Sequence, residues 1–196
     1  MKHSLLSLLL ACTLGAITVS STQAADKEVA VLKTSQGEMV VEFWPEVAPK
    51  TAANFIKLAK SGFYDGTAFH RIIKGFMIQG GDPLTKDPNK KAEYGTGGAG
   101  ANIKAEFNDR CHELGVPSMA RSQDPDSASS QFFICLGKAP QLDKKYTAFG
   151  KVIKGLNVLR KLGDTKVGAS PDGEQSRPLN RVALESVKIQ PAESVK

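Results

Sequence analysis

The pattern of apolar and polar positions begins with an alternation that predicts a β-hairpin. Val29 and Val31 precede a turn at 35–38, and Met39 and Val41 follow it with the same two-residue spacing. Successive side chains of a strand point to opposite faces of a sheet, so this spacing places one face of both strands in a core. The short glycine-containing turn favours antiparallel pairing of the two strands.

Two other segments repeat apolar residues at helical spacing. Pro49 suits the first turn of a helix, where its missing N–H is not needed, and Gly62 is placed to end the same element. A weaker repeat lies between Gly155 and Gly163. The apolar positions are Ala52, Phe55, Ile56 and Ala59 in the first segment and Leu156, Val158 and Leu159 in the second. We therefore predict two α-helices.

Short strand-like segments separated by Gly, Pro and Asp make up the rest of the chain. They span residues 69–73, 76–79, 116–120, 131–136, 147–153 and 181–189. In the last segment the apolar parity changes between Leu184 and Val187, which predicts a β-bulge at 185–186. Closing short antiparallel strands into a ring removes their exposed edges. We predict a mainly β fold, a closed eight-stranded antiparallel barrel capped by two α-helices, in a single domain at 25–196.

Residues 1–24 have the composition of a cleaved signal peptide. Lys2 and His3 precede an apolar stretch at 5–19, and a small residue, Ala24, stands where a signal peptidase cuts. This stretch of about 15 residues is shorter than the roughly 20 needed to span a bilayer. We expect export to the periplasm and no membrane association after cleavage. Lipidation of Cys12 is the alternative, although the apolar run continues beyond that cysteine.

The charge and the cysteines narrow the functions to be considered. The formal net charge is +6, but the basic residues are scattered, and the densest group, at 86–91, has no interleaved aromatic residues. No nucleic-acid partner is expected. Cys111 and Cys135 either pair in an oxidising compartment or leave Cys135 as a small buried apolar residue. Nothing in the sequence requires more than a monomer.

Three kinds of site are excluded for physical reasons: a dinucleotide site, a zinc site and a serine-hydrolase site. Residues 95–100 fit GxGxxG, but a dinucleotide site needs those glycines between a strand and a helix, and polar loop residues surround them here. The pair Cys111 and His112 offers too few ligands for zinc. The chain contains no GxSxG sequence of a serine hydrolase. We expect no cofactor and no metal.

The run FHRIIKGFMIQGGD, from Phe69 to Asp82, places a permanent positive charge beside apolar side chains. Arg71 lies in a β-branched stretch, and Phe76 and Met77 follow shortly after it. This combination is typical of a groove that acts on an uncharged peptide.

This run and several others resemble the cyclophilins, peptidyl-prolyl cis-trans isomerases, of the bacterial exported kind. The resemblance covers about residues 29–190. Besides FHRIIKGFMIQGGD, it rests on Pro49-Lys50-Thr51 with Asn54-Phe55, Ser118-Met119-Ala120, Ser130-Gln131-Phe132-Phe133-Ile134, and Leu142-Asp143 followed by Phe149-Gly150-Lys151-Val152. The family's eight-stranded barrel with two capping helices agrees with the fold predicted above.

The resemblance also implies a set of site residues. Arg71 is the catalytic candidate, a hydrogen-bond donor aimed at the prolyl nitrogen. The implied proline pocket is formed by Phe76, Met77, Phe133 and Leu142. Gln79 and the backbone at Ala120 and Arg121 would hold the peptide. Gln131 would support either the arginine or the peptide. Gln141 and Tyr146 stand where the best-known eukaryotic members have a tryptophan and a histidine. Loss of that tryptophan implies weak cyclosporin binding, whereas tyrosine keeps an aromatic wall.

The predicted function is therefore acceleration of X-Pro bond isomerisation during the folding of exported proteins, with proline-containing segments of unfolded chains as partners. The alternative is a chaperone module that binds such segments without significant turnover. Retention of Arg71 favours the enzyme, because a purely binding surface has no need of a donor at the prolyl nitrogen.

Overall fold

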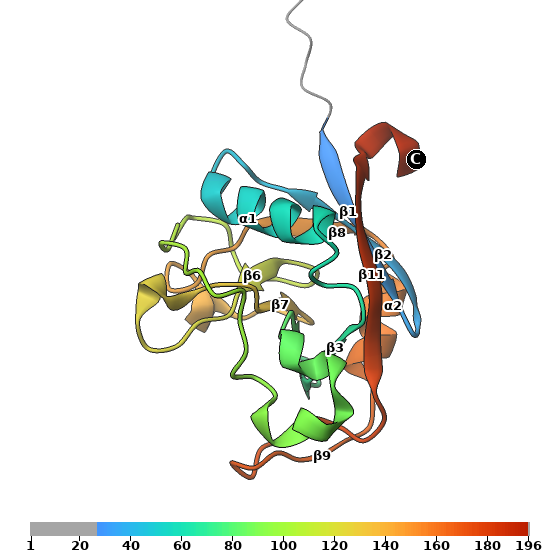
Figure 1. Cartoon of the computed structure of the whole chain (residues 1–196). Coiled ribbons are helices and arrows are strands. Elements are labelled where there is room, and N and C mark those ends of the chain that lie inside the picture. Colours follow the sequence, from blue (N-terminus) through green and yellow to red (C-terminus); the bar gives the residue numbers. More distant parts are fainter. Residues whose placement is uncertain (1–26, 196) are drawn as a thin grey trace, which may run out of the picture.

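The computed structural model describes residues 27–195 (Figure 1). The predicted signal peptide and Cys12 lie outside this range. The strands are β1 (Glu28–Thr34), β2 (Gly37–Phe43), β3 (Thr67–Phe69), β4 (Arg71–Ile73), β5 (Met77–Gly80), β6 (Pro117–Met119), β7 (Phe132–Cys135), β8 (Gly150–Lys154), β9 (Val167–Ala169), β10 (Gln175–Pro178) and β11 (Val182–Pro191). The helices are α1 (Pro49–Lys60) and α2 (Leu156–Gly163), with short 3-10 turns at Pro83–Lys86, Pro88–Glu93, Pro125–Ser127, Pro140–Leu142 and Ala192–Val195.

The first large sheet has the antiparallel order β3-β11-β1-β2-β8. Its β1–β2 hairpin confirms the prediction from the alternating pattern. Along β11, Lys33 pairs with Ser186 whereas Thr34 pairs with Leu184, so Glu185 is the extra residue of a bulge. The bulge explains how Leu184 and Val187, which differ in parity, both point into the core.

The second large sheet has the order β4-β5-β7-β6. The segment predicted as one strand at 69–73 is split at His70, so that β3 belongs to the first sheet and β4 to the second. On the other side, the N–H of Phe149 donates to the carbonyl of Pro117 at 3.1 Å, which links the approach to β8 with β6. The paired strands form a mainly β fold with two principal sheets. No strand pair joins these two sheets in the described residues, so strand pairing alone does not close the predicted eight-stranded barrel.

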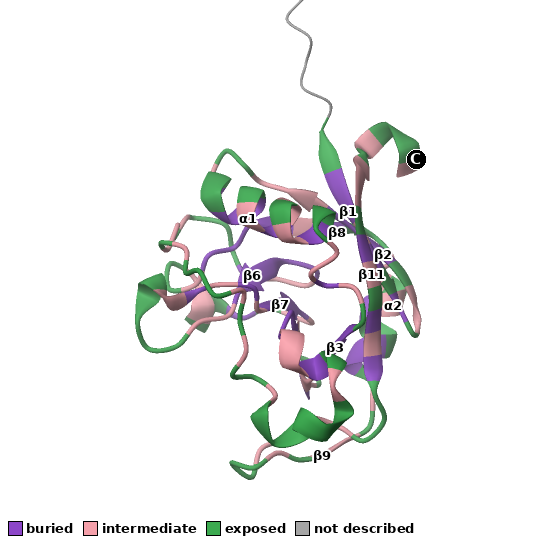
Figure 2. Ribbon diagram, in the orientation of Figure 1, coloured by how far each residue is buried: buried purple, intermediate pink, exposed green. Residues whose placement is uncertain are grey.

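An aromatic core joins the second sheet to α1. Phe55 of α1 stacks on Tyr64 with ring centroids 4.8 Å apart and meets Phe132 of β7 edge-on at 5.3 Å. The buried face of α1 turns inward and its exposed face outward (Figure 2). Burial raises the pKa of Tyr64 above its usual range, and its hydroxyl lies 3.2 Å from the carbonyl of Ser130.

The N-terminus of α1 is capped by a distant side chain. Ala48 at the N-cap has no side-chain oxygen to offer, and Glu106 takes that role, accepting from the backbone N–H of Lys50 at 3.0 Å and of Thr51 at 2.8 Å. A carboxylate at this position is favourable because the first helical N–H groups are unpaired and the helix end carries partial positive charge. This contact holds α1 against the loop at 103–108.

The small β9–β10 sheet is a feature that the sequence pattern did not predict. Its strands are short and half-exposed, with too few apolar residues for a period to be visible. The hairpin lies at the end of the molecule away from α1 (Figure 1), and β10 packs against β4. This contact brings the turn after β9 next to Arg71.

Candidate active site

Nine of the residues singled out in the sequence line one cavity of about 230 Å³. They come from the second sheet and from the segments that follow β6 and β7. The lining residues are Arg71, Phe76, Met77, Gln79, Ala120, Arg121, Phe133, Leu142 and Tyr146. The structure thus brings together side chains that are up to 75 positions apart in the chain.

Strand register explains why these side chains meet. Arg71 pairs with Gln79, and Gln79 pairs with Phe133, so the three lie in a row across β4, β5 and β7. The adjacent row, Ile72, Ile78 and Ile134, points the other way into the main core. Because strand side chains alternate between faces, the same three strands build the core with one face and the cavity with the other.

The apolar floor of the cavity consists of Met77 and Phe133, which are almost fully buried, with Phe76, Leu142 and Tyr146 packed around them. Tyr146 meets the ring of Phe133 edge-on at a centroid distance of 5.8 Å. This floor excludes water from one side of the site, and lower local polarity strengthens any hydrogen bond made there.

Behind the floor lies a chain of polar side chains, of which His112 and Ser118 are buried and Asp143 is partly exposed. His112 Nδ1 is 2.9 Å from Asp143 Oδ1, and His112 Nε2 is 2.9 Å from Ser118 Oγ. The backbone N–H of His112 also donates to Asp143 at 2.8 Å. Because of these hydrogen bonds, first from the backbone N–H and then from the ring, the pKa of Asp143 is lowered. The His112 ring stacks behind Phe133, with centroids 6.1 Å apart.

Ser118, His112 and Asp143 are the residue types of a hydrolase triad, but a substrate cannot reach the serine. Ser118 and His112 are 0% and 2% exposed, and a nucleophilic serine must reach its substrate. The chain of hydrogen bonds instead satisfies buried polar atoms and supports Phe133 from behind. Absence of the GxSxG sequence led to the same conclusion.

Arg71 lies at the edge of the cavity in a polar network with Gln79, Gln131 and Glu174. Its Nε donates to Glu174 Oε2 at 2.7 Å and its Nη2 to Oε1 at 2.9 Å, while Nη1 is 3.4 Å from Gln79 Oε1. Burial lowers the pKa of the preceding residue, His70, to about 4. Since His70 is then neutral near pH 7, Arg71 supplies the positive charge at this edge.

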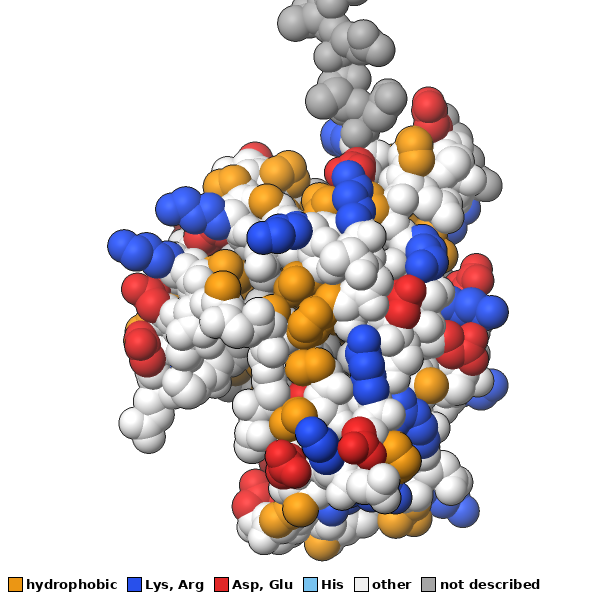
Figure 3. All heavy atoms as spheres, in the orientation of Figure 1, with side chains coloured by type: hydrophobic (Ala, Val, Ile, Leu, Met, Phe, Trp, Pro, Cys, Tyr) orange, Lys and Arg blue, Asp and Glu red, His pale blue; other side chains and the backbone are white. Residues whose placement is uncertain are grey.

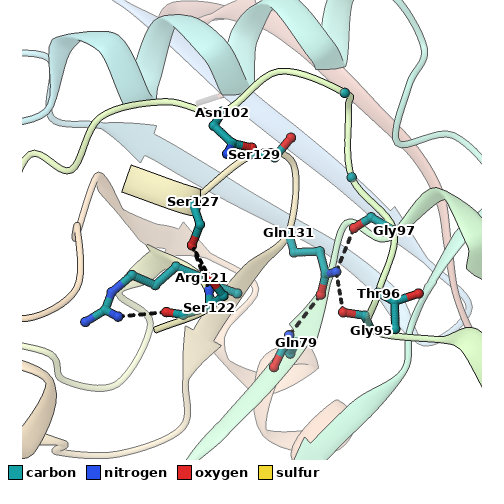
Figure 4. Close-up of a pocket in the computed structure, with 13 residues that line it drawn as sticks. Gln79, Gly95, Thr96, Gly97, Asn102, Arg121, Ser122, Ser127, Ser129 and Gln131 are labelled. Carbon is teal, nitrogen blue, oxygen red and sulfur yellow. Dashed lines mark hydrogen bonds between the residues drawn. The ribbon is translucent and has the colours of Figure 1, made fainter. Parts of the chain in front are cut away.

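Gln131 fixes the orientation of Gln79. Its Nε2 donates to the carbonyls of Gly95 and Gly97, each at 2.8 Å, which leaves its Oε1 to accept from Gln79 Nε2 at 3.0 Å (Figure 4). The side-chain oxygen of Gln79 is therefore turned toward Arg71. Gln131 does not line the cavity around Arg71 but an adjoining cavity of about 480 Å³, which shares Gln79, Ala120 and Arg121 with it.

The adjoining cavity is walled by the glycine-rich loop at 95–100. This loop is tied to β5 through Asp82, a fully buried residue whose carboxylate accepts from the N–H groups of Gly95 at 2.5 Å and Gly97 at 3.4 Å. A Cβ on Gly97 would lie 2.2 Å from that carboxylate, so the close approach requires glycine. The GxGxxG match therefore forms a wall of the groove.

Arg121 forms the rim between the two cavities. Its guanidinium lies over the Tyr146 ring at 4.6 Å, and its Nη2 donates to the carbonyl of Lys145 at 3.0 Å. Stacking on an aromatic face and binding to backbone carbonyls hold this long side chain in place. The interaction makes Tyr146 both a wall of the cavity and a support for Arg121.

Gln141 is the one predicted site residue that lies at neither cavity. It is exposed in the 3-10 turn Pro140–Leu142. With three residues per turn, neighbouring side chains point about 120° apart, so Leu142 faces the cavity while Gln141 faces outward. Neither cavity lining therefore supports a contact between Gln141 and the substrate, and that contact stays a prediction.

The sequence reading also missed residues that the fold brings to the groove. Nothing in the local sequence of Glu174 marks it, and the GxGxxG match at 95–100 was rejected as a dinucleotide site without a role in the groove.

Within the described residues both cysteines are free, with Cys111 exposed and Cys135 buried. Burial, followed by the charge of Asp143, raises the pKa of Cys135 to about 12, so its thiol remains protonated.

Residues 27–195 contain no group of three or more His, Cys, Asp or Glu side chains arranged to hold a metal ion. No helix in this part of the chain is both long and apolar enough to cross a membrane. On the face shown in Figure 3, Lys and Arg side chains are interspersed with Asp and Glu.

Comparison with known proteins agrees with the geometry. A family model described as cyclophilin type peptidyl-prolyl cis-trans isomerase/CLD matches residues 29–189. The chain is 43% identical over 146 residues to peptidyl-prolyl cis-trans isomerase ppi1 of Schizosaccharomyces pombe, which covers 71% of this chain and 87% of the relative. It is 41% identical over 157 residues to a probable peptidyl-prolyl cis-trans isomerase of Brucella abortus, covering 78% and 79%.

Among solved structures, the chain is similar to a cyclophilin type peptidyl-prolyl cis-trans isomerase of Cryptosporidium parvum crystallised in the presence of the dipeptide Ala-Pro. The TM-score is 0.73 at 32% sequence identity, and the match covers 83% of this chain and 98% of the other. Fungal, bacterial and protozoan proteins are all among the relatives, so the likeness identifies the family rather than one kind within it.

Proposed function

Because the chain belongs to the cyclophilin type peptidyl-prolyl cis-trans isomerase family, we propose that the cavity beside Arg71 binds the proline of an X-Pro segment and catalyses rotation about the preceding peptide bond. The observation that carries this proposal is the placement of Arg71, a permanent cation with N–H groups to spare, at the edge of a small apolar cavity.

The chemistry requires no nucleophile. Rotation about a peptide bond has a barrier of about 18 to 20 kcal/mol because amide resonance is lost in the twisted state. In that state the prolyl nitrogen recovers its lone pair, which a hydrogen-bond donor can then meet. Such a donor stabilises the transition state more than either planar ground state, and this difference lowers the barrier.

The hydrogen bonds of Arg71 leave donors for this task. A guanidinium carries five N–H groups, and contacts to Glu174 and Gln79 account for three of them within the described part of the chain. One N–H on Nη1 and one on Nη2 are left to face a substrate. The charge of arginine persists at any pH at which the protein is folded, so the donor is always available.

The two cavities match the parts of a peptide. At about 230 Å³, the cavity over the apolar floor is smaller than the roughly 300 Å³ at which drug-sized sites begin, and suits a single proline ring. The adjoining cavity of about 480 Å³ is lined largely by polar groups and takes the flanking backbone. Gln79, Ala120 and Arg121 line both cavities, so one continuous segment can occupy the groove.

Isomerase activity of the Arg71→Ala variant tests the proposed role of Arg71. In a protease-coupled assay with a short X-Pro peptide, loss of the donor is expected to reduce kcat/KM by about 100-fold, as for other preorganised donors at a transition state. Activity equal to that of the parent protein would refute the role of Arg71. Peptide binding without turnover in the parent protein would favour the chaperone alternative.

The cellular role proposed for the enzyme is assistance to the folding of exported proteins in the periplasm. The signal-peptide pattern of residues 1–24 supports this. Cell fractionation and the mass of the mature N-terminus test it. A chain that begins at Ala25 in the periplasmic fraction is expected, whereas a full-length cytoplasmic chain or a lipidated Cys12 would contradict the proposal.

Three finer points belong to the same proposal. The enzyme acts as a monomer, and it binds cyclosporin weakly, since the exposed Gln141 offers no aromatic wall. Backbone hydrogen bonds between Phe149 and Pro117 and between Val152 and Gly115 support closure of the two sheets into an eight-stranded barrel.

A further inference from the structure

Glu174 makes a bidentate ion pair with Arg71. It lies in the turn between β9 and β10, which contributes no residue to the lining of either cavity. The two contacts, Nε to Oε2 at 2.7 Å and Nη2 to Oε1 at 2.9 Å, are the parallel pair that a carboxylate forms with one edge of a guanidinium. The residues are 103 positions apart in the sequence. Such a pair fixes the plane of the guanidinium as well as its position.

The turn between β9 and β10 is built so that the backbone of Glu174 is held on both sides. The carbonyl of Glu174 accepts from the N–H of Ser170 at 2.8 Å, and its own N–H donates to Asp172 Oδ1 at 3.3 Å. Gly173, at φ +86°, adopts the left-handed conformation that closes the turn. The packing of β10 against β4 then sets the distance from this turn to Arg71.

The other contact of Arg71 does not fix the guanidinium by itself. Gln79 Oε1 lies 3.4 Å from Nη1, longer than the usual 2.7 to 3.2 Å or so for N–H···O bonds. Arginine has a long, flexible stem, and 37% of this side chain is exposed. Without Glu174, the long hydrogen bond to Gln79 would be the only one from the described residues to orient the guanidinium.

We propose that Glu174 is a positioning residue for the isomerase reaction: its carboxylate clamps the Nε and Nη2 edge of Arg71 so that the remaining N–H groups face the cavity. This inference rests on the proposed function, in which Arg71 donates to the prolyl nitrogen. Glu174 does not line the cavity and acts only through Arg71.

A role in stability alone does not account for this geometry. Partly exposed ion pairs contribute little to folding, because the charges are screened by water, and 36% of the Glu174 side chain is exposed. The Glu174–Arg71 ion pair orients the guanidinium, and a misplaced catalytic group loses most of its effect while the fold persists. A similarly exposed pair, Glu113 with Lys151 at 2.6 Å, lies outside both cavities and provides a matched control.

The test is a double-mutant cycle in the full chain, with kcat/KM for an X-Pro peptide as the readout. Glu174→Ala is expected to lower kcat/KM by about tenfold through kcat, with little change in peptide affinity. Glu174→Gln, which keeps a neutral acceptor, is expected to recover part of the loss. In the Arg71→Ala background, Glu174→Ala should cause no further loss, and Glu113→Gln should match the parent protein.

The outcomes separate this inference from the proposed function. If Arg71→Ala is as active as the parent, the proposed role of Arg71 fails. If Arg71→Ala loses activity while Glu174→Ala keeps or exceeds the parent kcat/KM, only the clamp is refuted. Additive losses in the double variant also refute it, because a residue that acts through Arg71 cannot matter once Arg71 is gone.

A spectroscopic readout follows the clamp directly. The Nε–H of Arg71 is held by Glu174, so its side-chain ¹⁵N–¹H resonance should exchange slowly with water in the parent protein and in Glu113→Gln. Glu174→Ala should broaden or abolish that resonance while thermal unfolding changes little. An equally protected resonance in Glu174→Ala would overturn the inference.

Discussion

The apolar floor and the polar network meet at one cavity but are built in different ways. The floor, centred on Phe133 and Met77, is almost fully buried and continues the packing of the second sheet. The network around Arg71 is half-exposed and joins two strand residues, Arg71 and Gln79, to Gln131 and Glu174 from segments outside the strands. The difference indicates that the floor couples the site to global stability, whereas the network can be altered with little effect on the fold.

The largest effect is expected from Phe133→Ala. Removing this ring opens a cavity between the floor and His112, and such truncations cost about 3 to 5 kcal/mol of unfolding free energy. The loss of an apolar wall for proline should also lower peptide affinity. Urea unfolding and peptide titration measure the two effects. Weakened binding without a fall in stability would contradict the idea that the floor is part of the core.

Ser118→Ala tests the polar chain behind the floor. The hydroxyl of Ser118 is the partner of His112 Nε2 in a fully buried site, and a buried polar atom left unpaired costs about 1 to 3 kcal/mol. We expect a fall in stability of that size in urea unfolding. Unchanged stability would show that the buried hydrogen bond does not support the floor.

The hydrogen bonds between His112 and Asp143 predict that part of the free energy of unfolding is lost in acid. The pKa of Asp143 is lowered in the folded state by hydrogen bonds from His112. Stabilisation from Asp143 is therefore complete above its unfolded-state pKa and is lost as the pH falls through the folded-state value. Asp143→Asn should unfold about 1 to 2 kcal/mol more easily at pH 7, with the gap narrowing in acid. A gap independent of pH would contradict this assignment.

Gln131→Ala is expected to lower activity more than stability, in contrast to the substitutions in and behind the floor. Loss of its bond to Gln79 frees the amide that faces Arg71, so kcat/KM should fall by about threefold to tenfold, since catalysis depends on close positioning. Stability should change by less than about 1 kcal/mol because the side chain is half-exposed. Gln190→Ala, the same substitution at a half-exposed position outside both cavities, is the control and should retain parent activity.

Features that depend on neighbours in the chain could be predicted from the sequence, whereas features that depend on distant contacts could not. Strand alternation and helical spacing located the β1–β2 hairpin, both helices and the bulge at Glu185, because each depends on neighbours in the chain. The split at His70 and the β9–β10 hairpin were missed, because sheet membership depends on distant partners. The residue pattern marked Arg71, Phe76 and Met77, a family resemblance supplied the rest of the floor, and the structure gathers them at one cavity.

Residues whose importance comes from tertiary contacts alone left no local signal. Glu174 lies in a polar turn that resembles any other surface turn until β10 is packed on β4. Asp82 was visible only as part of a Gly-Gly-Asp turn, and its hydrogen bonds to the loop at 95–100 required the fold. Gln141 lies outside both cavity linings, because a resemblance fixes the position in the sequence but not the direction of the side chain.

The central claim is that Arg71 acts on the twisted state of the prolyl bond and contributes little to ground-state binding. Exchange NMR on a saturated complex measures the cis-trans rate of the bound peptide, and titration of the same sample measures its affinity. For Arg71→Ala we predict a bound-state rate about 100-fold lower with peptide affinity within about threefold of the parent. An unchanged bound-state rate, with activity lost only through weaker binding, would contradict the account.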